Sequence, residues 1–312
     1  MTVKKNTSDI TGRVIQRYVI LAALYTLLIF LLPANTTAMR EHMLTPLQYK
    51  VLLFAIGLPS LMAWLAAFIG YARLHQYADS IADTSEGPSF KQLAKGSTWL
   101  AWSLPIPIIL SLLFNAYANG HSDFRPTAII TSNYLNLLFP LTALTIIGFA
   151  SRALTASAQL SFSVARARSI IAAFVVAGLA YCYFTFQRFD LSSFGSTDNP
   201  YYLPLWLMVI TVIIPYLYVW FIGLLSAYEI ALFSKNVKGV LYRQALRLLV
   251  FGLIAVVVSS IALQYINTVS PRVGYLVLDY KLLLILLFRI LTGLGFVLIA
   301  VGANRLKKIE EV

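Results

Sequence analysis

Eight long apolar runs dominate this sequence and constrain its fold more than any other feature. Crossing the ~30 Å hydrocarbon core of a bilayer takes about 20 apolar residues in a helix, because each residue adds about 1.5 Å. Backbone amides inside lipid must bond internally, and these runs lack the alternation of barrel strands. We therefore predict an all-α integral membrane protein with eight transmembrane helices. The predicted spans cover residues 17–32, 51–71, 97–117, 127–151, 169–187, 201–225, 248–268 and 282–303.

Composition supports a single membrane domain. Hydrophobic residues make up 59% of the chain and charged residues 12%, whereas a soluble domain carries about 25% charge. The longest connection between predicted spans is 25 residues, and independently folding domains begin near ~50 residues. The sequence contains no phosphate-binding loop of the ATPase type. We therefore expect no soluble domain and no ATP-driven step.

The distribution of basic residues predicts the orientation of the spans. With the N-terminus inside, the inner segments carry 17 of the 24 Lys and Arg residues and the outer segments carry 6. Because cytoplasmic loops are enriched in these residues, we expect both termini in the cytoplasm, and we favour a bacterial inner (plasma) membrane as the location. Basic residues precede the first span as they precede a signal peptide, but we interpret this span as an uncleaved anchor.

Two sequence patterns recur in the same order and indicate an internal repeat. A Pro-x4-Trp pattern at Pro59 returns at Pro215. A second pattern, G-x-x-[FY]-[KR]-Q-x-x-[KR], begins at Gly87 and again at Gly239, an offset of 152 residues. We predict a tandem duplication of a four-helix unit. Chance similarity between apolar helices is the alternative.

The predicted repeat divides the membrane domain into two units, residues 1–156 and 157–312. Because each unit has an even number of spans, both enter the membrane in the same direction. The pseudo-twofold axis should then lie along the membrane normal, as in carriers built from parallel halves. A crevice between the halves is the expected place for a pathway or a binding site.

The second repeated pattern, here called the rim motif, precedes a span at the predicted cytoplasmic face. Its glycine fits a turn or a helix start. Its two basic residues share one helical face and can reach lipid phosphates, while its aromatic residue fits the interfacial belt. We favour an anchor that sets helix depth and binds anionic head groups; the alternative is a gate or a docking motif for a cytoplasmic protein partner. The rim residues are Phe90, Lys91, Gln92, Lys95, Tyr242, Arg243, Gln244 and Arg247.

Several predicted spans contain proline, which removes a backbone donor and frees a carbonyl four residues earlier. We expect helix kinks there, either as packing features or as places where freed carbonyls face a cavity. The kink candidates are Pro59, Pro105, Pro107, Pro140 and Pro215. Two inner connections, residues 71–81 and 154–164, carry apolar residues at helical spacing, and we expect them to lie along the membrane surface.

Arg289 is the one charged residue well inside a predicted span. It follows Lys281 by eight residues, which places it roughly 12 Å deep. A charge at that depth costs about 2.5–3.5 kcal/mol on insertion scales and marks a functional site by default. Its predicted partners are backbone carbonyls freed by proline, tyrosine hydroxyls, an anionic ligand, or Asn133 or Asn136 in a polar stretch of the fourth span. Two interpretations stay open: a structural hydrogen-bond clamp, and a binding site for an anion or a lipid head group.

The sequence carries few groups suited to catalysis. No Asp or Glu falls within the predicted spans, and the three histidines share no metal-binding spacing. Motifs of hydrolases and metalloproteases are missing as well. We therefore expect neither a metal nor another cofactor, and we favour a protein that is not an enzyme. The net charge of +12 reflects topology and attraction to lipid head groups, so we expect no nucleic-acid partner.

These observations favour a transporter-like or ligand-binding membrane protein for a small, anionic or amphiphilic solute. Its site would lie between the two halves, with Arg289, Asn133 and Asn136 as polar lining. The first alternative is a non-catalytic membrane sensor or assembly subunit that docks a cytoplasmic partner through the rim motifs. A membrane enzyme is the third hypothesis.

Overall fold

Helices make up the part of the chain that the structure describes. The computed structural model describes residues 7–31, 45–120, 125–160, 213–269 and 276–310, with isolated positions between 168 and 210. No strand occurs among these residues. The helices are α1 (Thr7–Leu31), α3 (Pro46–Ser80), α4 (Gly87–Trp102), α5 (Pro105–Gly120), α6 (Arg125–Ser157), α9 (Ile214–Asn236), α10 (Val240–Val269) and α11 (Leu276–Glu310).

Seven helical stretches in the described residues are long and apolar enough to cross a membrane. They match the first four and the last three predicted spans. The fifth predicted span, residues 169–187, lies outside the described residues apart from isolated positions. The prediction of an all-helical, multi-pass chain is therefore confirmed, and its apolar helices indicate an integral membrane protein.

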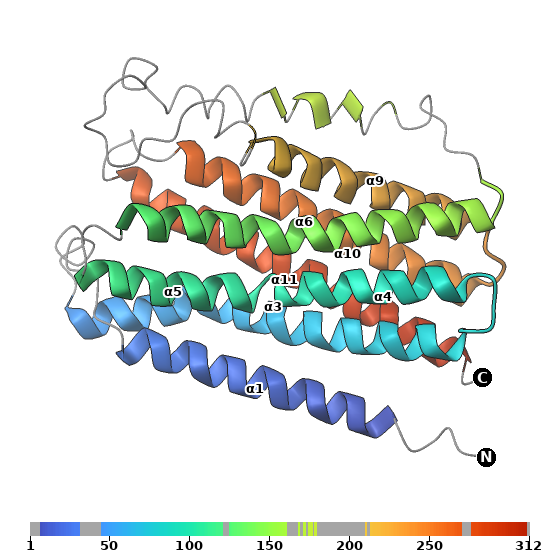
Figure 1. The fold of residues 1–312 in the computed structure, drawn as a ribbon, viewed down its shortest axis with the longest axis horizontal. Coiled ribbons are helices and arrows are strands. Elements are labelled where there is room, and N and C mark those ends of the chain that lie inside the picture. The colour runs from blue at the N-terminus through green and yellow to red at the C-terminus, as the bar shows by residue number, and fades with distance from the viewer. Residues whose placement is uncertain are drawn as a thin grey trace.

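Six helical segments form a closed ring. α3 packs against α4, α4 against α6, α6 against α9, α9 against α10, and α10 against α11, which returns to α3. α5 packs on α6, and α1 lies outside the ring against α3. Figure 1 shows the helices side by side with their long axes roughly aligned, and α1 along one edge. The first half of the chain meets the second at two ring contacts, α6 with α9 and α3 with α11.

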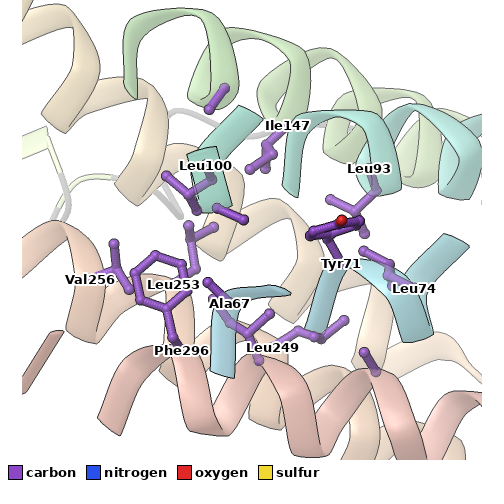
Figure 2. Close-up of a cluster of buried hydrophobic side chains, with 14 of the residues drawn as sticks. Ala67, Tyr71, Leu74, Leu93, Leu100, Ile147, Leu249, Leu253, Val256 and Phe296 are labelled. Carbon is purple, nitrogen blue, oxygen red and sulfur yellow. The ribbon is translucent and has the colours of Figure 1, made fainter. Parts of the chain in front are cut away.

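Apolar side chains from all six ring helices fill the interior. Figure 2 shows Tyr71, Leu100, Leu253 and Phe296 converging there from different helices. A cavity of about 40 Å³ remains among them, and every ring helix contributes to its wall. The centre of the ring is therefore packed. The largest fully buried aromatic side chains are Trp64, Trp220, Phe68, Phe90 and Phe233.

The helices are longer than the apolar runs that predicted them. α3 has 35 residues, which is roughly 52 Å of helix against a ~30 Å hydrocarbon core. It begins with a capping box. The Thr45 hydroxyl accepts a hydrogen bond from the backbone N–H of Gln48 at 3.3 Å, and the Gln48 side-chain oxygen accepts one from the backbone N–H of Thr45 at 2.9 Å. α6 and α11 have 33 and 35 residues. These helices are therefore long enough to project beyond the membrane.

The expectation that residues 71–81 lie along the membrane surface is wrong. α3 continues through most of this segment, and Tyr71, Leu74 and Tyr77 are buried in the ring with no more than 7% exposure. α6 likewise continues into the start of the segment 154–164. The apolar residues at helical spacing form the buried face of a continuing helix.

Proline shapes the helices in different ways. Pro59 and Pro140 lie inside α3 and α6, where kinks were predicted. Pro105 begins α5 and Pro107 lies in its first turn, so the third predicted span divides into α4 and α5. Pro215 instead lies in the first turn of α9, where a missing donor costs no intrahelical bond.

Glycine lets α10 and α11 approach closely. Gly252 and Gly295 face each other, and a Cβ added at Gly295 would lie 2.9 Å from the Gly252 carbonyl oxygen. Real side chains do not make contacts this short. Small residues are common between membrane helices because lipid leaves packing and hydrogen bonds as the main forces between them.

We predict that Gly295→Leu destabilises the bundle, because the new side chain must displace the backbone of α10. The expected cost is about 1–3 kcal/mol, as is typical of overpacking, and it should lower the thermal unfolding midpoint of the purified protein in detergent. Gly12→Leu is the matched control, since no atom lies within 4 Å of a Cβ built there. Equal midpoints for the two variants would contradict this account of the contact.

Candidate functional site

The two rim motifs lie at the same end of the bundle, which we call the basic end. There α3, α6, α9 and α11 end and α4 and α10 begin, near the C-terminus marked in Figure 1. Lys91 and Lys95 in α4 and Arg247 in α10 are exposed, as are Gln92 and Gln244. These five polar residues of the motifs thus point outward.

The aromatic residue of the first rim motif is buried, which corrects the expectation that it lies in the interfacial belt. Phe90 is 0% exposed, and its ring centroid lies 5.0 Å from that of Tyr77. Tyr242, the aromatic residue of the second motif, is half-buried, with its ring centroid 6.4 Å from the same tyrosine. Tyr77 therefore contacts both motifs, and these aromatic rings pack the two halves together.

The backbone geometry explains why both rim motifs begin with glycine. Gly239 has φ of +104°, a left-handed conformation that strains residues with a Cβ. A Cβ added at Gly87 would collide with the carbonyl oxygens of Ile81 and Ala82. The predicted turn or helix start is confirmed at both positions, because Gly87 begins α4 and Gly239 directly precedes α10.

A hydrogen bond links the turns that precede α4 and α10. Tyr242 Oη donates to Glu86 Oε2 at 3.1 Å, which joins the first turn of α10 to the residue before α4. Arg243 donates through Nη2 to the Val237 carbonyl oxygen at 3.3 Å, so it satisfies a carbonyl just beyond the end of α9. Side chains of the second rim motif therefore hold the connecting turns in place.

A pocket of about 630 Å³ lies beside this bond. The first half of the chain contributes Tyr77, Ile81 and residues 84–86, and the second half contributes residues 238–242 and Ile309. We call it the rim pocket. Its wall combines aliphatic side chains, two tyrosines, hydroxyl groups, one lysine and one glutamate. This mixture suits a ligand that has both apolar and charged parts.

Arg289 connects α11 to α3 inside the bundle. Its Nη1 donates to the carbonyl oxygen of Ile56 at 3.1 Å, three residues before Pro59 interrupts the hydrogen bonding of α3. Tyr25 of α1 lies within electrostatic range of the same guanidinium. This is the geometry of a hydrogen-bond clamp whose acceptor is a backbone carbonyl near a proline.

The structure does not bring Arg289 together with Asn136. Asn136 is exposed on α6, and the bond that Arg289 makes goes to α3. The side chain of Asn133 lies outside the described residues. Arg289 is also absent from the wall of the central cavity. Arg289 and Asn136 therefore do not form one site in the described part of the chain.

Sequence reasoning missed Glu229, a buried carboxyl group in α9. Its side chain is 2% exposed, and its Oε2 lies 2.6 Å from Ser151 Oγ. The predicted span ended at Leu225, whereas α9 runs to Asn236 within a stretch long and apolar enough to cross a membrane. The apolar run 230–233, which follows the glutamate directly, is the signal that the helix continues.

Comparison with other proteins assigns neither a family nor a function to this chain. No family model matches the chain, and neither a curated protein nor a solved structure matches it. Among the residues that the structure describes, no group of three or more His, Cys, Asp or Glu is placed to hold a metal ion. The candidate site therefore rests on the geometry of the chain itself, and the rim pocket is large enough for a small ligand.

We predict that Arg289→Ala destabilises the fold, because the Ile56 carbonyl loses a charged donor. The cost should be about 1.5–3 kcal/mol, the range for hydrogen bonds to charged groups, measured as a lower thermal midpoint in detergent. Arg305→Ala is the control, since it removes an exposed arginine from the same helix. A variant as stable as the wild type would favour the alternative, in which Arg289 serves a bound anion or head group.

Proposed function

We propose that the protein binds an amphiphilic ligand with an anionic head group in the rim pocket, between the two halves of the membrane domain. The observation that carries this proposal is the pocket of about 630 Å³, lined from both halves beside the Tyr242–Glu86 bond. Pockets for small molecules typically measure about 300–1,000 Å³. The function is then ligand binding at one membrane interface.

The chemistry of the pocket supports an amphiphile. Val240 and Leu241, at the start of α10, are 70% and 64% exposed, and with Ile81 they offer apolar surface to an aliphatic chain. Lys238 adds a positive charge to the pocket wall, where it attracts a carboxylate or a phosphate. The ligand class therefore combines an aliphatic chain with an anionic head group.

The packed centre of the ring favours ligand binding over transport of a solute between the two halves. Its cavity of about 40 Å³ is close to the volume of one water molecule, about 30 Å³. Carriers built from paired halves move solutes along an opening between the halves. Here such an opening would have to displace Tyr71 and Phe296 from the middle of the ring.

We further propose that the two halves are related repeats. If α3 corresponds to α9, α4 with α5 to α10, and α6 to α11, each neighbour relation in the ring has its counterpart. Trp64 and Trp220 occupy the matching Pro-x4-Trp positions and are 0% and 1% exposed. The pseudo-twofold axis would then run along the ring axis, and the rim pocket would lie where the first half meets the second.

We assign the basic end to the cytoplasm and the chain to a bacterial inner membrane, because the inner segments carry most of the Lys and Arg residues. The ligand would then enter from the inner leaflet or from the cytoplasm. Exposed Lys91, Lys95 and Arg247 at the same end would attract anionic head groups and raise their local concentration near the pocket.

We predict that Lys238→Glu weakens binding of an anionic amphiphile about tenfold, or about 1.4 kcal/mol, because it reverses a charge in the pocket wall. The measurement is photo-crosslinking of a diazirine-bearing long-chain fatty acid to the full chain in lipid nanodiscs, with labelled peptides identified by mass spectrometry. Labelling should fall on residues 77–86 and 238–242 and should decrease in the variant.

Lys235→Glu is the matched control, because it makes the same charge change at an exposed lysine outside the pocket. Equal loss in both variants would indicate general attraction to the membrane surface and would contradict the proposal. Labelling of lipid-facing helices without the pocket would contradict it as well. A stoichiometric protein that co-purifies and blocks labelling of the pocket would favour the docking alternative.

We predict that the basic end faces the cytoplasm. In a Cys182→Ser background, which removes the single cysteine, Lys95→Cys should react with a membrane-impermeant maleimide in inside-out vesicles and not in intact cells. His121→Cys, on the predicted outer side, should react in intact cells. The reverse labelling pattern would invert the topology.

A further inference from the structure

The contact between α6 and α9 contains a carboxyl group that the rim pocket does not use. Glu229 is 2% exposed, and Ser151 across the contact is 0% exposed. The helices approach closely there, since a Cβ added at Gly148 would lie 2.7 Å from Ile222 Cγ1 of α9. Both helices are long and apolar enough to cross a membrane, so this carboxyl group has little access to water.

Ser151 has one hydroxyl proton and two acceptors within reach. Its Oγ lies 3.0 Å from the Gly148 carbonyl oxygen and 2.6 Å from Glu229 Oε2. A carbonyl oxygen can only accept, so a proton that Ser151 donates to Gly148 is not available to Glu229. An oxygen–oxygen contact of 2.6 Å still requires a proton between the two atoms. A proton carried by Glu229 meets that requirement.

The surroundings of the second carboxyl oxygen of Glu229 also indicate that this group is protonated. Glu229 Oε1 is buried and has no hydrogen-bond partner. An ionised carboxylate is costly to bury without partners, whereas a protonated carboxyl group presents only a neutral carbonyl oxygen at this position. Arg152, on α6, is exposed, and its positive charge favours the ionised form of Glu229, but the atom within hydrogen-bond distance of the carboxyl group is Ser151 Oγ.

We propose that Glu229 and Ser151 form a proton-binding site in the contact between the two halves of the ring. Glu229 is a neutral carboxylic acid whose O–H donates to Ser151 Oγ, and the Ser151 O–H donates to the Gly148 carbonyl oxygen. The ligand is one proton. Its release would leave a negative charge in a dry helix contact, so occupancy of this site is coupled to the packing of α6 against α9.

Infrared spectroscopy of the full chain in lipid nanodiscs at neutral pH tests this proposal. A protonated carboxyl group has a C=O stretching band that a carboxylate lacks. We expect Glu229→Gln to lose this band, and the band in the wild type to shift on transfer to heavy water. Asp83→Asn, which removes an exposed carboxyl group, should leave the band in place. An unchanged spectrum in Glu229→Gln would overturn the proposal.

Ser151→Ala provides a second test if Glu229→Gln does not fold. This variant keeps the carboxyl group and removes the oxygen to which its proton is bonded. The band should therefore remain and move in frequency. A band at the wild-type frequency would show that the proton is not shared with Ser151, and the proposal would be wrong.

Discussion

Close backbone contact between helices is the constraint on which the rest of this structure depends. Apolar helices gain little by exchanging lipid for one another, so dense packing must hold them together. Gly252 faces Gly295 between α10 and α11. Between α3 and α11, a Cβ added at Gly70 would lie 3.3 Å from the Ala300 Cα. The ring of helices closes because the residues at such contacts are small.

Closing the ring leaves little room for polar groups, and several of those that are enclosed bond to a neighbouring helix. Arg289 of α11 bonds to the Ile56 carbonyl of α3, and the hydroxyls of Ser259 and Thr292 bond across α10 and α11 at 2.7 Å. Space for a ligand is found where the helices end, beside the connecting turns. A packed centre therefore moves the candidate site to the basic end of the bundle.

Sequence reasoning correctly predicted features that depend on the local run of residues. It failed for features that depend on contacts with another helix. The apolar runs predicted the helices because lipid imposes their length and composition. The same reasoning ended α3 too early and placed Phe90 at the membrane surface, yet Phe90 packs against Tyr77 in the interior. An apolar helix face can meet lipid or protein equally well, and the sequence does not state which one covers it.

The sequence by itself determined the helical membrane class, the glycine turns at Gly87 and Gly239, and the proline that divides α4 from α5, since each follows from the backbone chemistry of a few neighbouring residues. Only the tertiary structure decided the remaining contacts. The Tyr242–Glu86 bond spans 156 residues, and the Ser151–Glu229 contact spans 78. Such pairs depend on how each helix is rotated in the ring, and that rotation is decided by packing against all its neighbours at once.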